Sequence, residues 1–380
     1  MLHKGLWFQN YKQSKYILWA LWVVAIISGF QFYDHASNVA GNVQYYLEQG
    51  KNTFQYYFGA DLETISALQL ILCVGLAAFF VGFGRTNQTL ELTYAMPVKR
   101  EHIYLSKWLL GLIHIFGAST LGLIVQLAVV HTTILSSYLP DNLIWMYYVH
   151  QLFILCAVFS FSLWIGFIGG SVFSQVILCI IIPLVPYGLY GLIKEAVSLH
   201  YFALGITEIR ENWLFRQATS AWFEQLSFPI KLINIREIFR LAESQQGISK
   251  EQLEQIRQLY FGVKALIVPL IVTAGSLWGM IRMAGRSRNE NNGKLLLNDR
   301  FRPYLIAGII VCAFLFGGAL LENMLGTHYY GKEGEYSHRY VNNLIIFYVS
   351  GAISVVIVYG IIRKWLWGRV TLTKSRGSAG

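Results

Sequence analysis

Eight apolar stretches, each about as long as a bilayer is thick, constrain the fold of this chain more than any other feature. A helix rises 1.5 Å per residue, so about 20 apolar residues cross a hydrocarbon layer of roughly 30 Å. The stretches run near residues 16–33, 64–84, 107–133, 144–168, 172–193, 265–283, 303–321 and 342–362. Because 55% of the residues are hydrophobic and 13% charged, one soluble core could not bury this much apolar surface. We therefore expect an all-α, polytopic integral membrane protein with about eight transmembrane helices.

The N-terminal segment resembles a signal peptide, because Lys4, Lys12 and Lys15 precede the first apolar stretch. That stretch is long and lacks a small-x-small cleavage site, so we interpret it as an uncleaved anchor. Residues 2–15 mix aromatic and basic side chains, a composition that suits the inner membrane interface. The segment is either a simple anchor or a jointed elbow helix.

Basic residues concentrate in four segments: the N-terminal segment, the second-to-third connection, the sixth-to-seventh connection and the tail after the last span. These segments hold 18 of the 30 Lys and Arg but only four of the 20 Asp and Glu, namely Glu91, Glu101, Glu290 and Asp299. The positive-inside rule then places both termini in the cytosol. The basic balance is explained by membrane topology, so we expect no nucleic-acid partner, and the bacterial cytoplasmic membrane is the expected location.

Three regions are expected along the chain: an N-terminal transmembrane bundle (1–193), an extracytoplasmic insertion (194–264) and a C-terminal transmembrane segment (265–380) with a cytosolic loop at 283–302. A helix is predicted to begin near Ser249 and Gln252, which form a capping-box pattern, and to lead into the sixth span. The insertion is expected either to close the outer mouth of a pathway and contact cargo, or to form a packed cap. The outer loop 34–63 is expected to rest at the outer interface, and segment 322–341 suggests no role.

The fifth apolar stretch contains two prolines, Pro183 and Pro186. Proline removes a helical hydrogen bond, so we expect this helix to kink or break. Broken helices in lipid need protein or water around them, which makes Pro183, Pro186 and Tyr187 candidate pathway residues. A proline kink without a mechanistic role is the alternative.

No catalytic or metal-binding pattern is present, so we expect no enzyme activity and no directly bound cofactor. The sequence contains no GxxxxGK[ST], HExxH or GxSxG motif. Cys73, Cys156, Cys179 and Cys312 all fall in apolar stretches, where they are expected to be small buried hydrophobes. His114, His131 and His150 are each expected to be solitary interior histidines, and no span has a central acidic residue of the kind that secondary transporters use.

The residue pattern of the connection between the second and third spans, residues 85–107, is typical of an ordered segment and not of a flexible linker. Thr89 to Tyr94 favours a short helix, Pro97 ends it, and Glu101 to Lys107 begins the next helix. We therefore expect a rigid turn that faces the cytosol.

This connection resembles the coupling segment of ABC type-2 exporter permeases. The matching positions are Thr89, Leu90, Glu91, Leu92, Met96, Pro97, Lys99, Arg100 and Lys107. The basic-aromatic start and the connection from Arg282 to Arg302 match more weakly. Eight spans and a long insertion depart from the six spans usual in that family.

The resemblance implies that the matching residues from Thr89 to Arg100, with Glu101, dock in a groove of a separate ATPase subunit that binds ATP and Mg, whereas Lys107 opens the next span. It implies a second permease chain as partner, alongside membrane lipids. A second candidate contact comprises Arg286, Arg288, Glu290 and Lys294. The expected function is therefore the permease subunit of an ATP-driven exporter. Its cargo is expected to be amphipathic, such as a peptide, an antibiotic or a lipid-like compound. The alternatives are a secondary transporter, or a membrane-embedded sensor or resistance protein without an ATPase partner.

Overall fold

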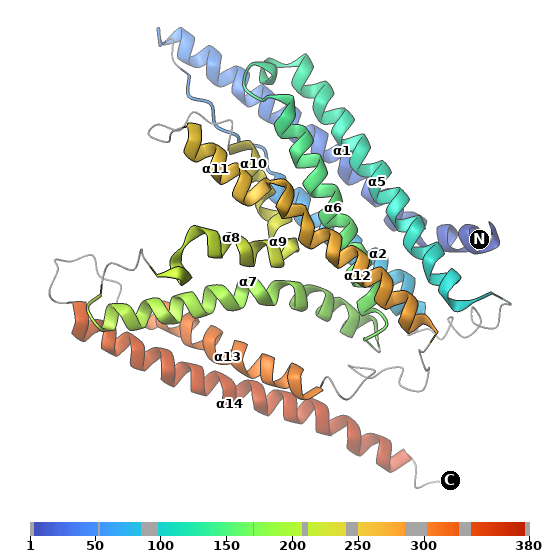
Figure 1. Cartoon of the computed structure of the whole chain (residues 1–380), viewed down its shortest axis with the longest axis vertical. Coiled ribbons are helices and arrows are strands. Elements are labelled where there is room, and N and C mark those ends of the chain that lie inside the picture. The colour runs from blue at the N-terminus through green and yellow to red at the C-terminus, as the bar shows by residue number, and fades with distance from the viewer. Residues whose placement is uncertain are drawn as a thin grey trace. The chain divides into compact units, whose positions relative to one another are not determined.

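The computed structural model describes residues 4–51, 54–84, 98–169, 171–206, 212–240, 250–285, 302–326 and 336–376. These residues are almost wholly helical and contain no β-strand (Figure 1). Eight of the helices are long and apolar enough to cross a membrane. The prediction of an all-α, polytopic membrane protein with about eight transmembrane helices is confirmed.

The spans and the short helices between them follow in chain order. They are α1 (Lys4–Glu48), α2 (Leu62–Ala77), the π-helical turn η1 (Ala78–Phe83), α5 (Arg100–Thr132), η2 (Ile134–Ser137), α6 (Asp141–Ile165), α7 (Val172–Ala203), η3 (Trp213–Phe215), α8 (Gln217–Leu226), α9 (Phe228–Ile233), η4 (Asn234–Arg236), α10 (Glu237–Arg240), α11 (Lys250–Phe261), η5 (Val263–Leu266), α12 (Ile267–Ala284), α13 (Arg302–Leu325) and α14 (Tyr336–Arg376).

Helix α1 is longer than the first apolar stretch at both ends. Its 45 residues continue through the basic-aromatic segment without a joint and include the first part of the expected outer loop 34–63. The prediction of an outer loop at 34–63 is therefore wrong for residues 34–48, which belong to the helix. The helix continues there because Phe32, His35 and Val39 recur at helical spacing and are buried.

Helix α7 runs through Pro183 and Pro186 without interruption, so of the two expected outcomes, a kink or a break, the break does not occur. Each proline lacks the amide donor to the carbonyl four residues earlier, but the neighbouring hydrogen bonds suffice to keep the helix continuous. Pro183 is buried, and Pro186 and Tyr187 are half-buried.

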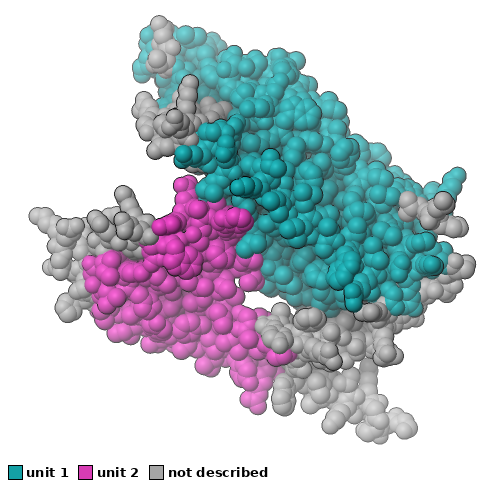
Figure 2. Space-filling model, viewed as in Figure 1, with its two compact units in different colours: residues 1–184, 224–297 teal, residues 185–223, 298–380 magenta. Residues whose placement is uncertain are grey.

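The chain forms two compact units, each assembled from two separate stretches (Figure 2). Unit 1 comprises residues 1–184 and 224–297, and unit 2 comprises residues 185–223 and 298–380. In unit 1 we call the end with the connection 85–99 the basic end, and the end with the turn 133–140 the far end.

Glycines allow the long helices of unit 1 to approach closely. A Cβ on Gly29 of α1 would lie 2.2 Å from Val125 Cγ1 of α5, and one on Gly111 of α5 would lie 2.1 Å from Phe159 Cζ of α6. A buried hydrogen bond of 2.6 Å from Gln126 Nε2 to Ser28 Oγ also joins α5 to α1. Small residues and buried polar pairs of this kind hold helices together in lipid, where the hydrophobic effect between helices is weak.

Unit 2 is built on the antiparallel pair α13 and α14 (Figure 1). Gly318 packs against the Phe347 side chain of α14, and Gly351 packs against Phe314 of α13. Near the end of α13, Asn343 Nδ2 donates to the buried Glu322 Oε1 at 2.9 Å. The glycines and this polar pair fix how the two helices align.

The described residues 224–240 and 250–261 of the insertion pack among the helices of unit 1. The Phe228 ring of α9 packs against Phe161 of α6 at 6.1 Å, and Phe239 of α10 packs against Tyr147 of α6 at 5.4 Å. Phe161 lies near the basic end of α6, and fourteen helical residues separate it from Tyr147, a rise of about 21 Å. We call residues 228–239 the re-entrant part of the insertion, because they run along more than half of the length of α6.

Candidate functional site

Of the residues expected to contact an ATPase, the structure describes only three, and these lie at the basic end of unit 1. Lys99 is the N-terminal cap residue of α5, Arg100 is the first residue of this helix, and Glu101 lies in its first turn. An acidic side chain there is favoured by the helix dipole. The beginning of a helix near Glu101 is confirmed. Outside the described residues lie Thr89, Leu90, Glu91, Leu92, Met96, Pro97 and the second candidate contact of Arg286, Arg288, Glu290 and Lys294.

A π-helical turn precedes this connection. Helix α2 changes into η1 at Ala78, and the helical residues end at Gly84, directly before residue 85. In a π-helical turn the hydrogen bonds run to the fifth residue instead of the fourth, which leaves a carbonyl without its usual partner. Such turns are rare and occur mainly where a helix serves a functional purpose.

Lys107 of α5 supplies a partner for this turn. Its Nζ donates to the Phe80 carbonyl oxygen at 2.7 Å, and its side chain is only 5% exposed. The ammonium group also lies 5.7 Å from the centre of the Tyr104 ring. Among the described residues no carboxylate lies within ion-pair distance of it. A buried cation without a carboxylate is costly, so its retention here ties α5 to η1 through a charge-assisted bond.

Helix α1 joins the same region. Asn10 Nδ2 donates to Ser106 Oγ at 2.9 Å, and both side chains are buried. Ser106 Oγ in turn donates to the Ile103 carbonyl, and Ser14 Oγ donates to the Asn10 carbonyl. The start of α5 is thereby bonded to α1 on one side and to η1 on the other.

The start of α7 closes against η1 around one glutamine. Gln175 Nε2 donates to the Ser162 carbonyl at 2.9 Å. A Cβ on Gly82 would lie 2.6 Å from Gln175 Oε1 and 3.0 Å from Val172 Cα, and a Cβ on Gly166 would lie 2.8 Å from Gln175 Nε2. Only glycine fits at both positions, because backbone and a bonded amide occupy the space.

These contacts form a frame around the connection 85–99. Its first flank, η1, is held by Lys107 and by the start of α7, and its second flank, α5, is held by η1 and α1. A displacement of either flank is therefore shared by the four helices α1, α2, α5 and α7, since packed interiors transmit strain.

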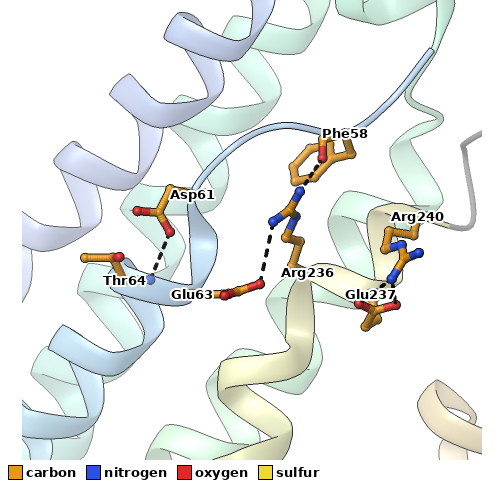
Figure 3. A network of polar contacts seen from close by, with 7 residues as sticks. All are labelled: Phe58, Asp61, Glu63, Thr64, Arg236, Glu237 and Arg240. Carbon is orange, nitrogen blue, oxygen red and sulfur yellow. Dashed lines mark hydrogen bonds and ion pairs between the residues drawn. The ribbon is translucent and has the colours of Figure 1, made fainter. Parts of the chain in front are cut away.

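A second polar network, at the far end, fastens the insertion to the start of α2 (Figure 3). Arg236 Nη2 donates to the Phe58 carbonyl at 2.9 Å, and Arg236 Nη1 lies 3.6 Å from Glu63 Oε1. Asp61 caps α2 by accepting from the Thr64 amide at 3.1 Å, and hydrogen bonds from the Thr64 side chain and then from this amide lower the pKa of the Asp61 carboxyl. The insertion is thus anchored beside the segment that enters the second span.

Two buried lysines were missed in the sequence, for different reasons. Lys107 was interpreted as the basic residue that opens the third span. Its spacing from Tyr104, Leu110 and Gly111 puts it on the buried face of α5, which is a detectable signal. The re-entrant α9 brings Lys231 against Phe261, the ring that His150 of α6 also contacts. The expectation that His150 is solitary is therefore wrong, and no local pattern indicates this long-range pair.

The cysteines and the acidic residues provide no further site. Cys73 and Cys179 are buried free thiols, Cys156 and Cys312 are half-buried, and none forms a disulfide. Within the described ranges, no group of three His, Cys, Asp or Glu side chains is placed to hold a metal ion.

Comparisons with protein-family models, with curated proteins and with solved structures find no match to this chain.

Proposed function

We propose that this membrane protein is the permease subunit of an ATP-driven exporter, with the connection 85–99 as the element that receives force from a separate ATPase. The observation that carries the proposal is the frame at the basic end. Lys107 bonds α5 to the π-helical turn, and Asn10 bonds α5 to α1, at distances of 2.7 and 2.9 Å. When an ATPase displaces a connection whose two flanks are held by hydrogen bonds and close packing, the membrane helices move with it. A flexible loop would take up the same displacement without moving the helices.

The resemblance of residues 89–107 to the coupling segment of ABC type-2 permeases supplies the second support. On this proposal Glu91 and Arg100 make polar contacts with the ATPase, and Leu92 and Met96 fill an apolar groove. ATP and Mg bind to the ATPase subunits, and their closure displaces the connection. The second and third spans then tilt, and a second permease chain completes the pathway.

Purification of the chain from native membranes tests the class of protein. The expected result is a stoichiometric P-loop ATPase that co-purifies. Transport by the purified chain alone, driven by a proton or sodium gradient, would instead identify a secondary transporter.

Charge reversal at Glu91 or Arg100 tests the interface. We expect Glu91→Lys or Arg100→Glu to uncouple ATP hydrolysis from transport while the chain still inserts and folds. Coupled activity equal to that of the unaltered protein would refute these contacts. Glu254→Lys is a matched control, because Glu254 lies on α11 of the insertion, away from the connection, and pairs locally with Arg257.

The side of the membrane is tested with a cysteine at Val98, the bend that precedes α5. A membrane-impermeant maleimide should label Val98→Cys only when the cytosolic side is accessible. Background labelling should be low, because the native cysteines lie within membrane-spanning helices. Labelling from the outside alone would exclude coupling to a cytosolic ATPase.

A further inference from the structure

The re-entrant part of the insertion brings a lysine into the interior of unit 1. Lys231 lies on α9, three residues after the Phe228 ring that packs on Phe161. Its side chain is 2% exposed, and its Nζ has no hydrogen-bond partner. The closest aromatic contact is with Phe261 at the end of α11, whose ring centre lies 5.6 Å from Nζ.

His150 of α6 contacts the same phenylalanine. Its ring centre lies 5.8 Å from that of Phe261 in an edge-to-face arrangement, and the residue is 3% exposed. His150 Nδ1 lies 2.8 Å from the Met146 carbonyl oxygen. His150 Nε2 has no hydrogen-bond partner; the Gly262 backbone is close but does not have the geometry of a hydrogen bond.

The hydrogen-bonding roles of the two groups are complementary. A carbonyl only accepts, so Nδ1 of His150 carries the hydrogen, and Nε2 of the neutral ring is an acceptor. Below its pKa the Lys231 side chain is an ammonium group, with three donors and no acceptor. Around the Phe261 ring the structure therefore holds an unused amine donor and an unused imidazole acceptor, both buried. Leaving buried polar groups unpaired is costly, so a site that retains both has a use for them.

His150 lies near the middle of a membrane-spanning helix. His150 is three residues from the central residue of α6 (Asp141–Ile165), a rise of about 4.5 Å. A buried polar pair lies beside it, because Gln151 Nε2 donates to Gln69 Oε1 of α2 at 2.7 Å. Polar and ionisable groups at this depth mark ligand and ion pathways in membrane proteins.

Glu224 of α8 is the acidic group that faces Lys231. Its Oε1 accepts from Asn234 Nδ2 at 3.3 Å, and it is not within ion-pair distance of Lys231. Burial raises the pKa of the Glu224 carboxyl, which favours its neutral form. The chain's own carboxyl is thus held by Asn234, and Lys231 stays open to another acid.

We infer that Lys231 and His150 form a binding site for the oxyacid head group of an amphipathic cargo, a carboxylic acid or a phosphate monoester. An oxygen of the acid accepts from Lys231 Nζ. A carboxylic acid in its protonated form, or a phosphate monoester that keeps one proton, also has a hydroxyl, which donates to His150 Nε2. The aromatic ring of Phe261 and the apolar neighbours receive the adjoining carbon chain. As a cargo site this inference rests on the proposed export function. The binding itself requires no ATPase.

The test is photolabelling of the full chain in phosphatidylcholine nanodiscs by a radiolabelled C18 fatty acid with a diazirine in its chain. Oleic acid, lysophosphatidic acid, methyl oleate and inorganic phosphate serve as competitors. We expect oleic acid or lysophosphatidic acid to compete, and the stronger of the two identifies the acid. Methyl oleate should not compete because it lacks the acid group, and inorganic phosphate should not compete because it lacks the carbon chain.

Variants decide whether the acid is bound by these residues. Lys231→Met and His150→Leu should each reduce labelling by at least about tenfold, the value of one charge-assisted hydrogen bond. Lys264→Met is the matched control, because Lys264 belongs to the same segment but is exposed, and it should label like the unaltered chain. Two variants are tested so that misfolding of one does not decide the result. Each variant is compared with the unaltered chain only if it elutes as a single species.

Equal labelling of both variants and the unaltered chain would overturn the site, as would competition by methyl oleate as strong as that by oleic acid. Failure of the proposed export function would give a different combination of co-purification and labelling results. If no ATPase co-purifies but labelling depends on Lys231, the acid site stands and the energy source is different. If an ATPase co-purifies but labelling ignores Lys231, the exporter stands and the site falls.

Discussion

The contact between Gly82 and the start of α7 makes a quantitative prediction about the frame at the basic end. In Gly82→Ala the added Cβ would lie 2.6 Å from Gln175 Oε1, 3.0 Å from Val172 Cα and 3.1 Å from Val172 Cγ2. Val172 Cα is backbone, and the Gln175 amide is bonded to the Ser162 carbonyl, so neither gives way freely. The substitution should therefore force η1 away from α7.

Overpacking of this kind costs about 1 to 3 kcal/mol. Gly75→Ala is a matched control on the preceding helix α2, because nothing lies within 4 Å of the Cβ that it adds. There alanine should stabilise the helix by up to about 1 kcal/mol, because glycine is the poorer helix former. The two variants make the same chemical change, but Gly82→Ala should lower the stability of the protein and Gly75→Ala should leave it equal or raise it.

Thermal unfolding in one detergent at one heating rate measures this difference. At about 2 °C per kcal/mol for a large chain, Gly82→Ala should melt about 2 to 6 °C below the unaltered protein. Gly75→Ala should melt at the same temperature as the unaltered protein or above it. If both variants melt alike, the close approach of η1 and α7 is absent, and the frame around the connection loses one of its supports.

Two further predictions concern the insertion. Arg236→Met should reduce the free energy of unfolding by about 1 to 3 kcal/mol because it removes the charged bond to the Phe58 carbonyl, whereas Arg240→Met, which loses a surface pair, should cost less than about 1 kcal/mol in a denaturant titration. Burial lowers the pKa of Lys231 to about 7 from 10.5, so above pH 7 the unfolded chain binds a proton that the folded chain does not. Stability should then rise with pH between about 7 and 10.5, and Lys231→Met should flatten that rise; an unchanged slope would show that Lys231 is not buried.

The prediction of eight spans succeeded because it depends only on local properties. About 20 apolar residues must cross the bilayer as a helix, whatever their neighbours, since lipid offers no partners for the backbone. The end of α1 was less predictable. Asp34, His35 and Asn38 are typical of an interfacial loop, but in the structure His35 bonds to Tyr56 at 3.0 Å and the helix continues to Glu48.

The candidate site was predictable only in part. The pattern from Glu101 to Lys107 correctly indicated a new helix, and the helical spacing of Lys107 contained the signal that it is buried. Its acceptor, the Phe80 carbonyl, lies 27 residues away and belongs to a π-helical turn, whose sequence, Ala78 to Phe83, is simply apolar. Backbone acceptors leave no trace in a sequence.

The amino-acid sequence by itself determined that this chain is helical, how many times it can cross a membrane and where its basic connections lie, because chain length in apolar residues and the position of charges settle these properties locally. Only the tertiary structure decided which helices pair. Membrane helices are apolar on every side, so periodicity does not identify the packed face. The same holds for the insertion, whose polar residues indicated an external segment. Lys231 is buried only because the re-entrant α9 carries it to the Phe261 ring that His150, 81 residues away in the chain, also contacts.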